Sequence, residues 1–421
     1  MRRGIFAAAA AVGILLLIGT LPGCGGYGGG GGSGSTAPVS GLTERAFVTS
    51  QNGPVPLEIA DASKDQLTVS TVALGGSSPA LMVPGANNTT LVFNAGTNGI
   101  SVVDTIKEAL VTTLGTTDCT AGTVSCELQL AGPTESITES SDAKSIYAAV
   151  PTTNQVNVVD LTVNPFKIST IPATAGNCTT GTTCLPGAHR LVLAHNNGKL
   201  LVFNELLNSQ LEVINTSDKT VQTVTSTSLD HPIFGVFTSD DSKAYILSCG
   251  AECGGKQASV AVLDMTTLTV GQTVNVDAAT IATSDSTNLY LAGSNPASPG
   301  AGSATILPIP ALTGAKQVKI GDGFHQVVSL FQSKFIVGAR TCTTGCLSIV
   351  DPAGGTAIVG QPKGDVTAIA PITPRSVFYD TEGGELRVYD VSTGNEHLTN
   401  GTLVMDVVGK ATSVLYVGPK T

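Results

Sequence analysis

The chain has 421 residues, of which 12% are charged and 4% are aromatic, with 49 Gly, nine Cys and no Trp. Its 21 Lys and Arg stand against 31 Asp and Glu, a net charge of −10, and no basic cluster offers the phosphate contacts that a nucleic acid needs. The abundance of Thr, Ser, Val, Gly and Ala disfavours coiled coils and multispan membrane proteins, and favours short strands joined by tight turns.

The N-terminus has the pattern of an export signal. Residues 1–3 are basic at two positions and residues 4–20 are an uncharged apolar run, so we predict a signal peptide over residues 1–23. The following Leu21-Pro22-Gly23-Cys24 resembles the lipobox of bacterial lipoproteins, although Pro22 is less usual there. That resemblance implies that Cys24 is lipidated and becomes the mature N-terminus. The alternative is a plain secretory signal with an incidental Cys.

A Gly-rich segment over residues 24–41 separates this signal from the rest of the chain. Its composition predicts a flexible tether that reaches roughly 20–25 Å on average. Gly25 is not the Asp that signals inner-membrane retention in lipoproteins, so the resemblance implies an outer-membrane lipoprotein of the bacterial cell envelope, facing the periplasm or the exterior. No later segment has the ~20 apolar residues that span a bilayer, and we expect the lipid to be the membrane anchor.

Residues 42–421 contain one short strand motif that recurs about every 47 residues and ends in Asp or Asn. A repeat of this length with alternating strands is typical of β-propeller blades. We expect each terminal Asp to cap the turn that follows it. The copies are residues 57–61, 100–104, 156–160, 211–215, 260–264, 347–351 and 386–390, with a degenerate copy at 305–309.

We name the four strands of a blade A to D, from inner to outer, and the recurring motif is strand C. The chain begins with a B strand at 46–49 and ends with an A strand at 412–417. The first blade would therefore take its inner strand from the C-terminal end, which closes the ring. We predict an all-β propeller of eight four-stranded blades, with seven as the alternative because the copy around Ile306 is weak.

The segment Thr90–Thr105 combines a strand, an Asn-containing turn and a Val-Val-Asp strand end. It resembles the repeat of YVTN-family β-propellers. The resemblance implies the fold and only loosely a function, because such propellers serve as surface proteins, scaffolds and occasionally enzymes.

Eight cysteines beyond Cys24 form four close pairs, which we interpret as disulfides of an exported chain. Zinc ligation is the alternative, but it needs four donors to converge and these pairs lie in different blades. The pairs are Cys119/Cys126 and Cys178/Cys184, assigned to D–A connections, and Cys249/Cys253 and Cys342/Cys346, assigned to B–C connections. Both connection types lie on one face of a propeller, so we expect the disulfides and the long loop 294–303 to mark a binding face.

Three of the five histidines stand at the starts of A strands, around the predicted mouth of the central channel. They are His189, His231 and His325, and Asp277 and Asp365 hold the same position in other blades. Imidazoles and carboxylates in a ring could form a metal or catalytic site. The alternative is a set of polar residues that line a water-filled funnel, and the sequence leaves metal binding open.

Motifs of hydrolases, nucleotide-binding loops and zinc proteases are absent from the sequence. The lack of Trp also argues against propellers that stack a quinone cofactor or carry Trp-ending Asp boxes. We therefore predict a non-catalytic, monomeric binding or scaffold protein without a cofactor, whose partner is a protein or an envelope polymer. The alternative is a lactonase-like or metal-dependent hydrolase with its site at the channel mouth.

Overall fold

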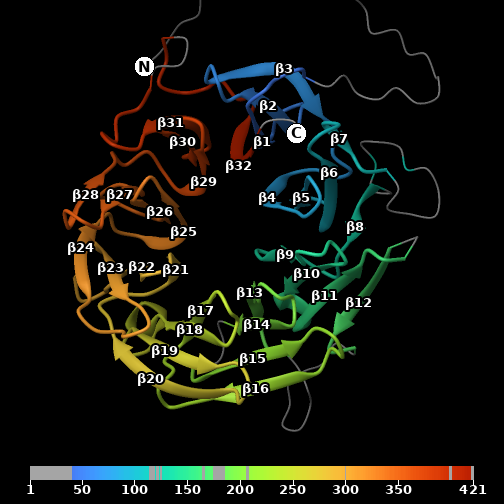
Figure 1. The fold of residues 1–421 in the computed structure, drawn as a ribbon. Coiled ribbons are helices and arrows are strands. Elements are labelled where there is room, and N and C mark those ends of the chain that lie inside the picture. The colour runs from blue at the N-terminus through green and yellow to red at the C-terminus, as the bar shows by residue number, and fades with distance from the viewer. Residues whose placement is uncertain are drawn as a thin grey trace, which may run out of the picture. The chain divides into compact units, whose positions relative to one another are not determined.

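The computed structural model of the chain describes residues 40–112, 119, 123, 126–163, 166–173, 185–204, 208–298, 300–397 and 401–418. These residues belong to one compact unit, a ring of eight antiparallel sheets (Figure 1). The predicted signal peptide, most of the tether, Cys24, Cys178 and Cys184 lie outside the described residues. Within the described part, no helix has the length and apolarity needed to cross a bilayer.

The first four blades follow the predicted order of strands. From the inner to the outer strand they are β32 (Lys410–Gly418), β1 (Arg45–Gln51), β2 (Leu57–Asp61) and β3 (Gln66–Val72) in blade 1; β4 (Pro79–Pro84), β5 (Thr89–Asn94), β6 (Gly99–Asp104), β7 (Ala109–Leu110) and β8 (Leu128–Gln129) in blade 2; β9 (Ile137–Glu139), β10 (Ser145–Val150), β11 (Gln155–Asp160) and β12 (Lys167–Ile171) in blade 3; and β13 (Ala188–Leu193), β14 (Lys199–Asn204), β15 (Gln210–Asn215) and β16 (Val221–Thr225) in blade 4.

The other four blades continue the same order and confirm that the copy around Ile306 is a blade. They are β17 (Pro232–Phe237), β18 (Lys243–Ser248), β19 (Ser259–Asp264) and β20 (Thr269–Asn275) in blade 5; β21 (Ile281–Ser284), β22 (Asn288–Ser294), β23 (Gly302–Pro308) and β24 (Lys316–Ile320) in blade 6; β25 (Phe324–Phe331), β26 (Lys334–Arg340), β27 (Leu347–Asp351) and β28 (Thr356–Val359) in blade 7; and β29 (Val366–Ile372), β30 (Val377–Glu382) and β31 (Glu385–Asp390) in blade 8. Within the described residues, the 3₁₀ helices η2 (Pro151–Thr153) and η3 (Gly250–Cys253) lie in B–C connections.

Every pair of neighbouring blades packs around its own apolar cluster. Eight such clusters occur, and each combines residues of two adjacent blades, as where Phe47 of blade 1 meets Val92 of blade 2. The B and C strands lie between two neighbours and are buried almost throughout, as β5 and β6 are. A strand buried on both faces is rich in apolar residues, whereas an outer strand such as β16 keeps exposed threonines.

The ends of the chain close the ring as predicted. Strand β1 pairs with β32 in an antiparallel register that sets Phe47 opposite Leu415 and Thr49 opposite Ser413. The Thr49 and Thr412 hydroxyls share a buried hydrogen bond of 2.9 Å. The first blade is therefore built from both ends of the chain: its inner strand β32 is C-terminal, and its other three strands are N-terminal.

The strand-ending Asp caps its turn, as predicted. In blade 8, Asp390 Oδ1 accepts hydrogen bonds from the Ser392 and Thr393 backbone N–H groups at 2.9 and 2.8 Å. The Ser392 hydrogen bond, with those of Thr393, lowers the pKa of Asp390 even though burial opposes this. The equivalent caps are made by Asp61, Asp104, Asp160, Asn215, Asp264 and Asp351.

Two outer edges depart from the regular blade. In blade 2, β7 and β8 both pair with β6, so the segment 111–127 interrupts the outer strand. The assignment of Cys119 and Cys126 to a D–A connection was therefore wrong, because the chain resumes the same strand after the insertion. In blade 8 the sheet has three strands, and its outer edge meets later residues at two isolated bridges, Leu386 with Met405 and Tyr389 with Glu396.

A partly buried ion pair reinforces the closure of the ring. Asp65, in the β2–β3 turn of blade 1, accepts both Nη atoms of Arg375 from the β29–β30 turn of blade 8, and it accepts the Tyr379 hydroxyl at 2.6 Å. Arg375 also donates to the backbone oxygen of Ala62 at 2.7 Å. This bidentate pair joins the first and last blades on the face opposite the B–C connections.

We expect Arg375→Met to lower the apparent free energy of unfolding by about 2–4 kcal/mol, because it leaves the Asp65 side chain, which is 11% exposed, without its cation. Urea titration measures the change. The matched control is Lys64→Met, since the Lys64 side chain is 68% exposed and its pair with Asp61 is worth at most about 0.5 kcal/mol. Equal losses in both variants would contradict a role of Arg375 in closing the ring.

Candidate functional site

In the described part of the ring, the D–A and B–C connections lie on one face, which we call the loop face. Backbone hydrogen bonds join the two kinds of connection directly: the Gly250 N–H donates to Asp230 O at 3.0 Å, and the Gly383 N–H donates to Asp365 O at 2.9 Å. The prediction that both connection types share a face is confirmed. The opposite side, with the A–B and C–D turns, is called the turn face.

Aspartates in the D–A connections hold the B–C loops in place. Asp322 Oδ1 accepts the Thr343 and Thr344 N–H groups, each at 2.8 Å. Burial alone would raise the pKa of Asp322, but the hydrogen bonds from Thr343 and Thr344 outweigh it and hold that pKa well below its usual range. Asp230 does the same for the loop of blade 5, where it accepts the Lys256 N–H at 2.6 Å.

A buried polar residue at the second position of the five-residue strand C motif also supports the loop face. The Ser101 and Ser348 hydroxyls each accept a backbone N–H of a D–A connection at 3.0 Å, from Gly75 and Gly321 respectively. Asn157 accepts the Ala131 N–H at 2.9 Å in the same way. The loop face is thus fixed by side chains that come from inside the blades.

Three of the four predicted disulfides fall in the described residues and are confirmed: Cys119–Cys126, Cys249–Cys253 and Cys342–Cys346. The last two close B–C connections on the loop face, as predicted. The end of the blade 2 insertion lies on the same face, because Glu127 accepts a hydrogen bond from Asn94 at the B–C turn. Each bridge closes a loop of a few residues, so it stiffens that loop without joining one blade to another.

The three predicted histidines occupy three different environments. His189 Nε2 lies 3.4 Å from Glu135 Oε2, and His231 Nδ1 lies 2.8 Å from Asp230 Oδ1. His325 is 1% exposed, and its Nε2 donates to the Gly321 carbonyl at 3.1 Å. Burial lowers the pKa of His325 to about 4, so its ring is neutral at pH 7.

The two predicted aspartates serve the loops as well. Asp365 Oδ1 accepts the Thr341 N–H at 2.6 Å, and Asp277 Oδ1 accepts the Asn295 side-chain amide at 2.9 Å. In the part of the chain that is described, no three His, Cys, Asp or Glu side chains converge where they could share a metal ion.

A different set of side chains meets at the centre of the ring on the loop face. Arg190 of β13 places its guanidinium carbon 5.9 Å from the Phe234 ring centroid and 5.7 Å from that of Phe324. Arg340, the cross-strand partner of Phe324, stacks on the same ring at 4.8 Å. Arg190 also donates to the Thr280 backbone oxygen at 3.0 Å. The cluster therefore spans blades 4 to 7, and each of the four side chains is half-buried.

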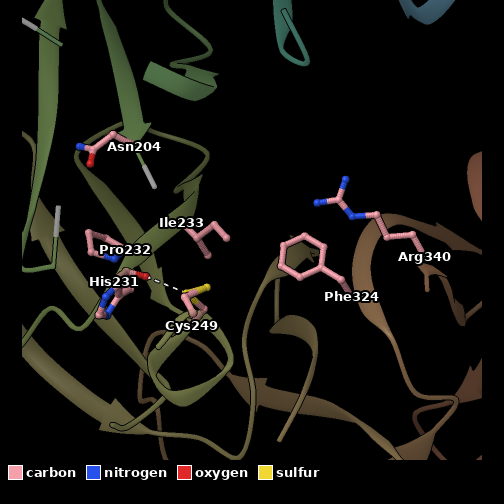
Figure 2. Close-up of a pocket in the computed structure, with 8 residues that line it drawn as sticks. Asn204, His231, Pro232, Ile233, Cys249, Phe324 and Arg340 are labelled. Carbon is pink, nitrogen blue, oxygen red and sulfur yellow. Dashed lines mark hydrogen bonds between the residues drawn. A yellow bond between two sulfur atoms is a disulfide. The ribbon is translucent and has the colours of Figure 1, made fainter. Parts of the chain in front are cut away.

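A cavity of about 260 Å³ lies beside this cluster (Figure 2). Phe324 and Arg340 stand on one side of the view, with Pro232 and Ile233 facing them from the other. The wall is completed by Asn204, His231 and the Cys249–Cys253 disulfide. Its surface is mostly apolar, and a cation stands at its edge, which suits an amphiphilic ligand.

The sequence pattern does not point to Phe324 or Arg340 as site residues. Of the predicted residues, His231 does line the cavity. Phe324 directly precedes the predicted His325, and Arg190 directly follows the predicted His189, so at those two strand starts the prediction selected the neighbouring residue. The usable signal is the scarcity of arginine, since only five follow the predicted signal peptide. Which of those five arginines lie close together depends on how the blades are arranged around the ring, and the repeat alone does not predict this.

A second cavity of about 200 Å³ on the loop face contains an unusual carboxyl group, Glu252. This residue belongs to the Cys249–Cys253 loop, and its Oε2 accepts the Ser294 N–H at 2.7 Å. Burial raises the pKa of Glu252 to about 7, although the Ser294 hydrogen bond opposes the shift. Asp277 and Asn295 line the same cavity.

No protein-family model matches the chain, and no curated protein matches it. Among solved structures, it is similar to dihydro-heme d1 dehydrogenase NirN in complex with DHE, with a TM-score of 0.61 and 11% identity over 89% of this chain and 75% of that one. It is also similar to a functionally unknown protein from Desulfotomaculum acetoxidans, with a TM-score of 0.53 and 12% identity over 90% of this chain and 100% of the other.

A further similar structure is the β-propeller domain of Cps50 (Swd1) from Myceliophteria thermophila, with a TM-score of 0.50 and 10% identity over 75% of this chain and 98% of that one. The chain has a β-propeller fold. Identities of 10 to 12% show nothing beyond that fold.

We expect Glu252→Gln to change how stability depends on pH. The folded-state pKa of Glu252 is raised, so folding favours the protonated carboxyl group. The stability that the protonated Glu252 gives the folded chain is therefore fully present below the unfolded pKa near 4.5, and it is lost as the pH rises through about 7. The amide still accepts the Ser294 N–H without ionising. The variant should therefore be more stable than the native chain at pH 8, by about 1–3 kcal/mol, and equal to it near pH 4.5.

Urea titrations between pH 4.5 and 8 measure this difference. The control is Glu385→Gln, whose side chain is 52% exposed and should change stability by less than about 0.5 kcal/mol at any pH in this range. Parallel pH profiles for the native chain and Glu252→Gln would contradict the raised pKa.

Proposed function

We propose that the protein is a non-catalytic binding protein of the bacterial cell envelope, anchored by a lipid on Cys24, which uses its loop face to bind a protein or an envelope polymer. The observation that supports this proposal most directly is the fixed arrangement of that face. Two disulfides close its B–C loops, and Asp230, Asp322 and Asp365 tie those loops to the D–A connections. Loops held in one arrangement bind with less loss of conformational entropy.

The sequence motif at residues 21–24 supports the anchor. A Gly-rich tether behind a lipidated residue would let the propeller reorient while it stays near the membrane. Disulfides in loops also fit an exported chain, since such bonds persist in oxidising compartments.

Site-directed photo-cross-linking in living cells tests the use of the loop face. A photoreactive residue is placed at Ala251, exposed on the Cys249–Cys253 loop, and in a matched variant at Ala353, exposed in the β27–β28 turn of the turn face. We expect an adduct of higher mass from the Ala251 position and none from Ala353. Equal adducts from both faces, or none from Ala251 while the protein is present at normal abundance, would contradict the proposal.

Cys24→Ser tests the anchor independently. We expect the full-length native chain to sediment with membranes and the variant to move into the soluble fraction, because it cannot carry the lipid. The control is Cys249→Ser with Cys253→Ser, which leaves Cys24 in place and should sediment as the native chain does. Unchanged membrane association of Cys24→Ser would refute the lipid anchor.

A further inference from the structure

We propose that the cavity beside Arg340 binds a small organic monocarboxylic acid, with the carboxylate on the Arg340 guanidinium and the apolar body against Phe324, Pro232 and Ile233. This inference goes beyond the proposed function, because a small acid binds in this cavity whether or not a macromolecular partner occupies the loop face.

The first support is that Arg340 is uncommitted. Among the described residues, it is the arginine whose side chain has neither an ion pair nor a hydrogen bond, and that side chain contacts the ring of Phe324. The others have polar partners: Arg45 binds Glu108, Arg375 binds Asp65, Arg387 binds Glu396, and Arg190 binds the Thr280 carbonyl. A half-buried guanidinium with unused N–H donors is costly unless solvent or a ligand accepts them.

The second support is the way in which Arg340 is held. Its guanidinium carbon lies 4.8 Å from the Phe324 ring centroid, so the ring restrains the cation without using its hydrogen-bond donors. A guanidinium presents its donors as a planar fork that matches the two oxygens of a carboxylate. Stacking on Phe324 therefore leaves that fork available to a ligand.

The third support is the local electrostatic environment. Arg190 contacts the same ring, with its guanidinium carbon 5.7 Å from the centroid. Two cations near one ring repel each other, and an anion between or beside them relieves that repulsion. In a chain of net charge −10, these two arginines make a local cationic centre that attracts an anion.

The size and lining of the cavity narrow the ligand class. Its volume of about 260 Å³ is below the roughly 300–1,000 Å³ of sites for drug-sized ligands, so the ligand is small. Pro232, Ile233, Phe324 and the disulfide offer an apolar wall. A phosphate would leave that wall unused, whereas a monocarboxylic acid with an apolar body uses both the wall and the single uncommitted arginine.

Titration calorimetry on the purified full chain tests the proposal with benzoate and hexanoate as probes. We expect each acid to bind at one site per chain, and we expect benzamide, which has the shape of benzoate without its charge, to bind at least tenfold more weakly. Arg340→Gln should weaken benzoate binding tenfold or more. Arg340→Lys, which keeps the charge and loses the fork, should also weaken it, by a smaller factor.

The matched control is Lys319→Gln, which removes one positive charge from the exposed outer strand β24 and should leave the affinity within twofold of native. Thermal unfolding shows whether each variant is folded. If Arg340→Gln does not fold, Phe324→Leu replaces it, with an expected loss of several-fold because the stacking partner of Arg340 is removed.

No binding of either acid by the native chain would overturn the proposal, and so would equal losses in Arg340→Gln and Lys319→Gln. Tighter binding of inorganic phosphate than of benzoate would overturn the assignment to a carboxylic acid. These results are independent of the cross-linking from Ala251. Cross-linking from Ala251 without binding of either acid would refute the acid site alone. Binding of the acids without cross-linking from Ala251 would refute the proposed macromolecular partner alone.

Discussion

The pairing of β1 with β32 is the constraint on which the ring depends. Each blade buries its two faces only against neighbours, and the eight apolar clusters are complete only if the first and last blades also meet. The residues that make this contact, such as Thr49 and Thr412, are 363 positions apart, so closure costs more chain entropy than any other pairing in the molecule. The Asp65–Arg375 pair joins blades 1 and 8 and so helps to offset the entropy cost of closing the ring. A disulfide such as Cys249–Cys253 closes a short loop and does not stabilise the closure.

A closed ring allows its two faces to take different roles. On the turn face, the Asp at the end of strand C binds its own turn, as Asp390 does with Ser392 and Thr393. On the loop face, polar groups reach from one connection to another, as Asp322 does to Thr343. Local caps give short turns that vary little, whereas supports between connections let loops grow longer and remain ordered.

Much of this organisation could be predicted from the sequence because it is encoded locally. The recurring strand motif that ends in Asp or Asn specifies both a strand and its cap, and its spacing specifies a blade. The ring, its closure and the loop face therefore followed from the repeat. The insertion that holds Cys119 was misplaced because a two-residue strand such as β8 has no pattern of its own. It is recognised as part of the outer strand only once Leu128 pairs with Ile100.

His231 and the Cys249–Cys253 disulfide of the candidate site were predicted, but Arg190, Phe324 and Arg340 were not, and the reason is the register of the inner strands. Successive residues of a strand point to opposite sides, so a shift of one position exchanges a buried side chain for one at the centre of the ring. In β25, His325 points into the packing between blades and is 1% exposed, while its neighbour Phe324 meets Arg190 from blade 4. Imidazole chemistry made the histidines the obvious candidates in the sequence. The fold uses His325 as a neutral core residue and brings arginine and phenylalanine together beside the cavity.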